Sequence, residues 1–322
     1  MALKDKIPFG MVLPHRAMDP LRLSDVRDVS QRAEALGFSD LWVTENTLDN
    51  NYSLDPMVVL TYAAALTNRI GLGVAVVVLP VHHAIHAAHQ AVSLDFVSNG
   101  RAILGVGLGR EDDYHDFQVP TERRVRRFKE QIDVMKALWT QKRVTYEGHF
   151  YKLNDTAITL KSAHKPHVRL WLGGAHPDAV TRAVTMGTGW IGAGGQTKDG
   201  FEASVALLRT ALDKAGLARS SFTISKRVFI AVEEKPGVAR GQLLRWCTDV
   251  YRNPSLIDTG AVYGTPEQCR EKIEALIASG ADHLLLNPVA QYPEQLEAVA
   301  EVVGLRQVLR PWNAAPSISQ AS

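Results

Sequence analysis

The sequence predicts a single (β/α)8 TIM barrel, because short apolar runs alternate with helical patterns along most of its 322 residues. Counting these runs gives eight strand–helix pairs, and barrels of this kind routinely exceed the usual size of one domain. The runs are apolar on both faces, which suits parallel strands covered by helices. A doubly wound open sheet is the alternative fold. In both folds the ligand site is expected at the carboxyl ends of the strands.

Four of the pairs lie in the first part of the chain. Their strands are predicted at 7–13, 40–44, 70–79 and 102–106. Their helices are predicted at 21–36, 57–66, 83–97 and 121–141. Gly37 directly follows the first helix, as glycine often does where a helix ends. The last helix carries an apolar stripe at helical spacing, formed by Val125, Phe128, Ile132, Met135 and Leu138.

The second part of the chain continues the alternation with two interruptions. Strands are predicted at 168–172, 189–192, 222–232 and 283–286. Helices are predicted after Pro177, through Leu207 and Leu212, from the N-cap Thr265, and over 293–309. The segments 142–167 and 233–262 break the rhythm, so we interpret them as insertions into one domain spanning residues 1–310. Residues 311–322 are small, polar and interrupted by proline, which predicts a flexible tail.

Composition and charge are those of an ordinary globular protein. The formal net charge of +2 creates no overall field that favours nucleic acid or an anionic membrane as a partner. Cys247 and Cys269 form neither a disulfide framework nor a paired zinc motif. The chain shows no signal-peptide pattern and no apolar stretch approaching the roughly 20 residues of a membrane helix. We therefore expect a cytoplasmic protein.

The most informative segment is 98–110, where the fourth predicted strand ends in three alternating glycines. Gly105, Gly107 and Gly109 lack a side chain, so the backbone can adopt positive φ and let a flat ring or an anion approach closely. A dinucleotide-binding fingerprint would place its last glycine at the start of a helix, whereas a polar, irregular segment follows Arg110. Tight packing of a strand end is the structural alternative for these glycines.

Five segments resemble the bacterial luciferase-like oxidoreductase family. They read GFSDLWVTE at 37–45, RIGLGVAV at 69–76, LDFVSNGR at 94–101, GVGLG at 105–109 and GGAHPDAVTRAVTMG at 173–187. The resemblance implies a (β/α)8 fold that binds the deazaflavin coenzyme F420, with FMN as the alternative cofactor. It also implies a cis peptide bond between Ala75 and Val76, which would form a bulge behind the cofactor ring. Members of this family commonly form homodimers or larger homo-oligomers.

The strand ends supply the cofactor site that the resemblance implies. The ring is expected against the third strand, and the phosphate at the helix start after the fifth strand, where backbone N–H groups are free. The loop after the sixth strand would form the other wall. The expected cofactor-binding residues are Glu45, Gly73, Val74, Ala75, Val76, Gly107, Leu108, Gly109, Arg110, Gly173, Gly174, Ala175, Ala193 and Gly194. The acidic tail of F420 would meet Arg110, the basic run 123–127 and Lys161, although a solvated helix face also explains that run.

Three residues near the strand ends are candidates for catalytic proton transfer: Glu45, His15 and His83. Glu45 ranks first, because a carboxyl group beside a bulky apolar ring is desolvated and becomes a usable acid near neutrality. Its alternative role is to bind backbone at a strand end. His15 is the second candidate, with a pocket-lining role as its alternative. Many family members have a histidine where this chain has Asn46, and sugar-phosphate dehydrogenases of the family have a glutamate where it has Arg110.

Three functions are open at this point. The first is hydride transfer between F420 and a small organic substrate. The second is an FMNH2-dependent monooxygenase served by a partner flavin reductase, and the third is a non-catalytic barrel that binds a cofactor. No metal is expected: His82, His86 and His89 share a helical face, yet the family chemistry needs none. The polar loop at 112–116 is interpreted as a lid over the pocket.

Overall fold

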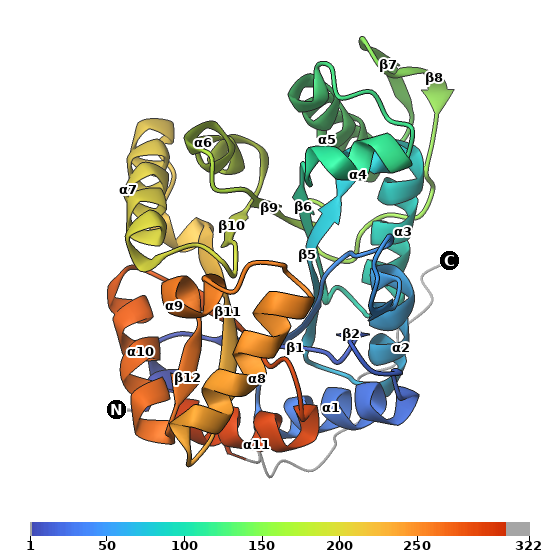
Figure 1. Ribbon diagram of the computed structural model, residues 1–322. Helices are drawn as coiled ribbons and strands as arrows, with labels where there is room; N and C mark the ends of the chain where they lie inside the picture. The colour runs from blue at the N-terminus through green and yellow to red at the C-terminus, as the bar shows by residue number, and fades with distance from the viewer. Residues whose placement is uncertain (1, 307–322) are drawn as a thin grey trace.

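The computed structural model describes residues 2–306 and shows a closed barrel of parallel strands (Figure 1). The eight barrel strands are β1 (Phe9–Val12), β3 (Asp40–Val43), β5 (Gly71–Val78), β6 (Ala102–Gly107), β9 (Arg169–Gly173), β10 (Gly189–Gly192), β11 (Thr223–Val232) and β13 (His283–Asn287). Pairing of β10 with β11 closes the circle of strands. The predicted (β/α)8 barrel is therefore confirmed, and the open sheet is wrong.

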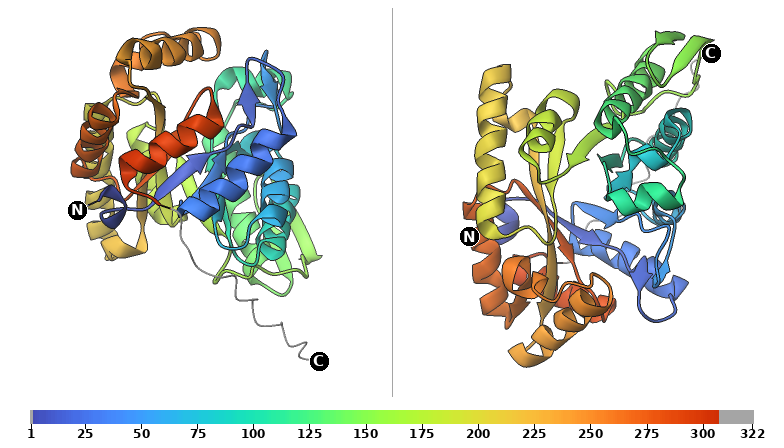
Figure 2. Two further views of the ribbon diagram at one scale, coloured as in Figure 1. Left: turned by 90° about the horizontal axis from the view of Figure 1, so that it is seen from below. Right: turned by 45° about the horizontal axis from the view of Figure 1, so that its top comes forward.

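Helices surround the strands on the outside (Figure 2). They are α1 (Leu23–Leu36), α2 (Pro56–Leu66), α3 (Ala84–Val97), α5 (Arg124–Thr140), α6 (Pro177–Met186), α7 (Lys198–Ala215), α10 (Pro266–Ala278) and α11 (Tyr292–Val303). Local caps fix their ends: Gly37 ends α1 with φ +96°, and the side chain of Thr265 accepts the N–H of Gln268 at the start of α10. None of the helices within the described residues is both long and apolar enough to cross a bilayer.

The last helix is shorter than the sequence predicted. We expected it over 293–309, but α11 ends at Val303 because Gly304 adopts φ +82° and its N–H bonds back to Ala300. The predicted tail at 311–322 lies outside the described residues.

The two interruptions of the rhythm carry their own secondary structure. Segment 142–167 holds the antiparallel hairpin of β7 (Val144–Glu147) and β8 (Lys152–Thr156), which extends beyond α5 in Figure 1. Segment 233–262 holds α8 (Pro236–Asp249), α9 (Leu256–Gly260) and the first residue of β12 (Val262–Gly264), which pairs with the end of β11. Between strands and helices lie β2 (Arg16–Ala17), β4 (Tyr52–Ser53), α4 (Glu111–Asp116), and the short 3-10 helices Leu3–Asp5, Leu79–Val81 and Arg219–Ser221.

The inside of the barrel is filled from its amino-terminal end. The rings of Trp42 and Trp171 lie 5.2 Å apart between centroids, and His283 packs against both. His283 also bonds Asp40 at 3.0 Å. Burial alone would raise the pKa of Asp40, but the charge and hydrogen bond of His283 lower it overall. Gly73 makes this packing possible, since a β-carbon there would lie 2.4 Å from the Trp42 ring. These side chains fill the amino-terminal half of the barrel interior, and a cavity remains at the carboxyl ends.

Candidate active site

A cavity of about 880 Å³ opens at the carboxyl ends of the strands. This volume lies within the range of small-molecule and cofactor sites. The lining comes from the ends of β3, β5 and β11 and from four connecting segments: Arg16, Thr44–Asn51, Ala75, Val76, Val78, Val81, Gly109, Arg110, Asp113, Asp116, Phe117, Arg227 and Asp249–Arg252. The site therefore lies where the sequence predicted it, at the barrel mouth.

One side of the cavity is formed by Ala75, Val76, Val78 and Val81, which we call the apolar wall. The peptide bond between Ala75 and Val76 is cis, which confirms that prediction. The pairing of β5 with β6 shifts register between Val74 and Val77 at the same place. The strand therefore bulges into the cavity, and the bulge presents two small apolar side chains to it.

Glycines on the neighbouring strands accommodate this bulge. A β-carbon on Gly107 would lie 2.7 Å from a methyl group of Val76, and one on Gly173 would lie 3.0 Å from its other methyl group. We expected these glycines to expose bare backbone to a ligand. The structure instead gives Gly107 and Gly173 a packing role, because they leave the space that the Val76 side chain fills.

The predicted cofactor-binding residues fall into three groups in the structure. Those lining the cavity are Glu45, Ala75, Val76, Gly109 and Arg110. Those behind its wall are Gly73, Val74, Gly107 and Leu108, where Val74 is 1% exposed. Those at the end of β9 and in the loops after β9 and β10 are Gly173, Gly174, Ala175, Ala193 and Gly194. Gly174 and Ala175 are exposed just before α6. The helix start itself offers no free N–H group at its first positions, because Pro177 has none and the N–H groups of Asp178 and Ala179 already bond His176.

A buried lysine that the sequence analysis missed shapes the loop after β10. Lys226 is 0% exposed, and its Nζ donates to the carbonyl oxygens of Ala193 (3.1 Å) and Gln196 (2.9 Å). Burial lowers the pKa of Lys226 to about 8. With two carbonyl groups turned toward the lysine, the loop that precedes α7 is held in one conformation.

Glu45 joins the end of β3 to the apolar wall. One carboxylate oxygen accepts the N–H of Val78 at 2.6 Å, and the other bonds Nε2 of His82 at 2.6 Å. Burial lowers the pKa of His82, but the hydrogen bond and charge of Glu45 outweigh this and raise it overall. His82 precedes α3 rather than lying on it. The two side chains form an ion pair beside the cavity, with the proton held between them.

His15 lies beneath the cavity surface and does not line it. It is 3% exposed; its Nε2 accepts the backbone N–H of Thr44, and its Nδ1 donates to the carbonyl of Leu13. Burial lowers the pKa of His15 to about 4, and the charges of Arg227 and Arg16 add to this effect. The imidazole is therefore neutral near pH 7, and we assign it the positioning of Thr44, which does line the cavity.

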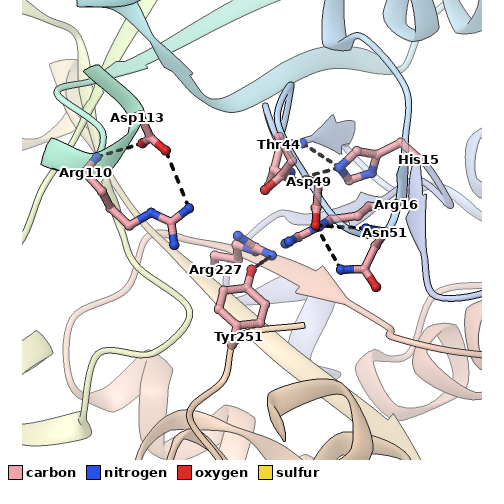
Figure 3. A network of polar contacts seen from close by, with 10 residues as sticks. His15, Arg16, Thr44, Asp49, Asn51, Arg110, Asp113, Arg227 and Tyr251 are labelled. Atoms are coloured by element: carbon pink, nitrogen blue, oxygen red, sulfur yellow. Dashed lines mark hydrogen bonds and ion pairs between the residues drawn. The ribbon is translucent and has the colours of Figure 1, made fainter. Parts of the chain in front are cut away.

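A second side of the cavity is built from Arg16, Asp49, Arg227 and Tyr251, which we call the cationic wall (Figure 3). Arg16 forms an ion pair with Asp49 and lies 5.5 Å above the Tyr251 ring. Burial raises the pKa of Asp49, but the hydrogen bonds of Arg16 and Asn51 outweigh this and lower it overall. Arg227 donates from Nη2 to the Tyr251 hydroxyl at 2.8 Å. The sequence analysis missed this wall.

The remaining acidic residues of the cavity also have partners. Asp113 accepts the backbone N–H of Arg110 at 2.9 Å and pairs with its guanidinium at 3.6 Å, on the side that lies across from Arg227 in Figure 3. Asp116 contacts His115, and Asp249 lies 3.7 Å from Arg245. The segment predicted as a lid thus contributes Asp113, Asp116 and Phe117 to the rim.

The basic residues expected to meet an acidic cofactor tail mostly point elsewhere. Arg123 contacts His149, and Arg127 lies over the Phe150 ring. Lys161 donates to the carbonyl oxygens of Leu138 and Gln141 at the end of α5. Of the residues proposed for the tail, only Arg110 lines the cavity. Within residues 2–306 no three histidine, cysteine or acidic side chains are grouped as a metal site.

Comparisons with known proteins agree with this geometry. The chain is 30% identical over 190 residues to the uncharacterized protein y4vJ of Sinorhizobium fredii, an alignment that covers 58% of this chain and 50% of that protein. It is 26% identical over 228 residues to the F420-dependent glucose-6-phosphate dehydrogenase of Kineococcus radiotolerans, covering 68% of this chain and 67% of that enzyme. The chain thus spans half to two thirds of the length of these relatives.

Solved structures show the same fold. The crystal structure of the monooxygenase RslO1 from Streptomyces bottropensis superimposes with a TM-score of 0.79 at 23% sequence identity, covering 92% of this chain and 98% of that chain. The family model described as luciferase-like monooxygenase matches residues 7–259. This match, together with the closed barrel, the cis bond and the cavity at the strand ends, shows that the chain belongs to the luciferase-like monooxygenase family.

Proposed function

We propose that the protein is an oxidoreductase that transfers a hydride between coenzyme F420 and a small organic substrate. The observation that carries this proposal is the apolar wall: a bulged strand that presents the small apolar side chains of Ala75, Val76 and Val78 to a cavity of about 880 Å³. A flat tricyclic ring fits against such a surface, and the volume leaves room for a small substrate. The similarity to an F420-dependent dehydrogenase supports F420 as the cofactor.

The chain's own residues would bind and shield the reacting groups. Ala75 and Val76 would support the ring from one face, while the exposed backbone of Gly174 and Ala175 before α6 would lie against a phosphate. Bound F420 supplies two-electron hydride chemistry. Reduction of a carbonyl or imine also needs a proton, and Glu45 and His82 hold one at the cavity between Oε1 and Nε2.

An FMNH2-dependent monooxygenase is the second candidate. The family description and the similarity of fold to RslO1 favour it. In that case the protein would receive reduced flavin from a partner reductase. The same wall and the same exposed backbone before α6 would then hold an isoalloxazine ring and its phosphate. Measuring which cofactor the purified protein binds therefore discriminates between the two candidates.

The test is to titrate the purified protein separately with F420 and FMN, in their oxidised and reduced forms, and to follow tryptophan or cofactor fluorescence. We expect micromolar binding of F420 and at least a hundredfold weaker binding of FMN. Val76→Lys, which places a charge on the wall, should abolish F420 binding, while Gly237→Ala, with nothing within 4 Å of the new β-carbon, should leave it unchanged.

The opposite preference would reverse the assignment. Micromolar binding of reduced FMN with no binding of F420 would establish the monooxygenase. If F420 binds but no oxidation or reduction occurs with a panel of alcohols, aldehydes, enones and imines, the protein is a non-catalytic cofactor-binding barrel.

A further inference from the structure

Arg227 is a cation of the cavity lining that has no ion-pair partner among the described residues. The lining holds four arginines and five carboxylates, and each carboxylate has an arginine or histidine partner other than Arg227. In the part of the chain that the structure describes, Arg227 has neutral partners only, because Asn287 and Tyr251 accept its hydrogen bonds. The positive charge of Arg227 is therefore not cancelled by a direct ion pair.

The guanidinium of Arg227 is held in a fixed orientation. Its Nε donates to Oδ1 of Asn287 at 2.9 Å, its Nη2 donates to the Tyr251 hydroxyl at 2.8 Å, and its Cζ lies 4.8 Å above the Phe229 ring. No acceptor within residues 2–306 bonds Nη1, which is therefore available to a ligand. The side chain is half-buried, so water screens its charge less than that of a surface arginine.

The other arginines of the cavity do not offer the same feature. Arg16 is neutralised by Asp49, and Arg110 is paired with Asp113. Arg252 is exposed at the rim, where solvent and salt weaken its field. A guanidinium that is oriented, half-buried and without a protein anion is suited to bind an oxygen of a carboxylate or phosphate through a charge-assisted hydrogen bond, here from Nη1.

We propose that Arg227 binds an anionic group of the substrate, a carboxylate or a phosphate. The proposal rests on the proposed function in taking the occupant to be the substrate of this cavity. Asn287 and Tyr251 are positioning residues that orient the guanidinium. The substrate class is accordingly small organic acids or phosphate esters, whose anionic end contacts the cationic wall while the reacting carbon faces the apolar wall.

The experiment compares benzoate with benzamide, which have the same shape but differ in charge, by isothermal titration calorimetry at pH 7. Wild-type protein should bind benzoate at least tenfold more tightly than benzamide. Arg227→Gln should lose at least tenfold in benzoate affinity and leave benzamide unchanged. Arg227→Lys keeps the charge but not the planar fork, so it should give an intermediate affinity. Phenyl phosphate is the third ligand: its binding relative to benzoate assigns the phosphate or the carboxylate class.

Arg240→Gln is the matched control, because it removes an equal charge from an exposed position on α8 and should keep wild-type benzoate affinity. Folding of each variant is checked by its thermal midpoint. Equal benzoate affinity in wild type, Arg227→Gln and Arg227→Lys would overturn the proposal, as would equal binding of benzoate and benzamide. The F420 titration is independent of this contrast: absence of F420 binding would refute the proposed function, while the benzoate contrast would still decide the anion subsite.

Discussion

The two walls of the cavity are built in different ways. The apolar wall is nearly continuous in sequence, from Ala75 to Val81, and glycines on the adjacent strands leave the space behind it. The cationic wall combines four separate segments: Arg16 after β1, Asp49 after β3, Arg227 on β11 and Tyr251 between α8 and α9. The first wall is encoded locally, whereas the second exists only once the barrel has closed.

The walls also differ in how their atoms are held. Behind the apolar wall, backbone atoms are close-packed, so an added side-chain atom cannot be accommodated unless the strands move. The cationic wall is held by hydrogen bonds and ion pairs, and some of its polar atoms remain open to the cavity. Substitutions should therefore affect stability most strongly at the apolar wall and ligand charge selectivity at the cationic wall.

The largest expected effect is that of Gly105→Ala behind the apolar wall. A β-carbon at this position would lie 2.1 Å from the carbonyl oxygen of Val74 and 3.0 Å from Ile191. A backbone oxygen cannot rotate away as a flexible side chain can, so β5 and β6 must separate. We expect the free energy of unfolding to fall by about 4 kcal/mol, at the upper end for overpacking. Urea unfolding measures this, and the F420 titration measures the effect on binding.

Gly107→Ala provides a graded comparison, because its β-carbon meets a side-chain methyl group of Val76 at 2.7 Å rather than backbone. Gly107→Ala should lower the free energy of unfolding by less than Gly105→Ala does. Adding Val76→Ala should restore part of this loss, and a double-mutant cycle measures how much. Gly237→Ala is the neutral control. If Gly105→Ala proves as stable as Gly237→Ala, strand spacing does not fix the wall.

The difference between the walls also explains what could be predicted from the sequence. The eight strands, the bulge at Ala75–Val76 and the position of Glu45 follow from local apolar runs, glycines and family motifs. No sequence pattern indicated a role for Arg227, because one arginine in a long apolar strand does not differ from an ordinary polar residue. Tyr251 lies in a segment that was interpreted only as an insertion. Their association depends on strands and loops distant in sequence, which periodicity does not report.

The hydrogen-bond partners of Glu45 and His15 could not be predicted for the same reason. Both residues lie near the barrel mouth as expected, but their hydrogen bonds reach Val78, His82 and Thr44 on other elements. A single sequence identifies a titratable residue near a strand end. It does not show that such a residue is already bonded on every side.

The second effect concerns His15, which positions Thr44 beneath the cavity, and it depends on pH. The folded pKa of His15 is about 4, below its ordinary value of 6.5, so the unfolded chain binds the proton first as the pH falls. The stabilisation is thus complete above pH 6.5 and is lost as the pH falls from 6.5 to 4. The loss amounts to roughly 3 kcal/mol at 1.4 kcal/mol per pH unit. Urea unfolding of wild type at pH 7 and pH 4.5 measures most of it.

His15→Asn cannot take up this proton, so the acid-induced loss of stability should be smaller in the variant by that amount. The variant also loses hydrogen bonds, and for this reason the difference between the two pH values is compared rather than stability at one pH. His89→Asn, an exposed histidine on α3, is the control and should follow wild type. Identical acid sensitivity in His15→Asn and wild type would show that His15 takes up its proton in the folded state as readily as in the unfolded chain.

The smallest expected effect tests the difference in charge between the two walls. Asp49→Asn removes the carboxylate that neutralises Arg16, so a second guanidinium becomes available beside Arg227. We expect benzoate affinity to rise about five-fold, or about 1 kcal/mol, because the charge of Arg16 is then no longer cancelled by Asp49. Asp28→Asn on α1 makes the same change of charge far from the cavity and should have no effect. A fall in benzoate affinity in Asp49→Asn would mean that the carboxylate holds Arg16 and Tyr251 in place rather than cancelling a charge, and the cationic wall would then depend on that ion pair for its shape.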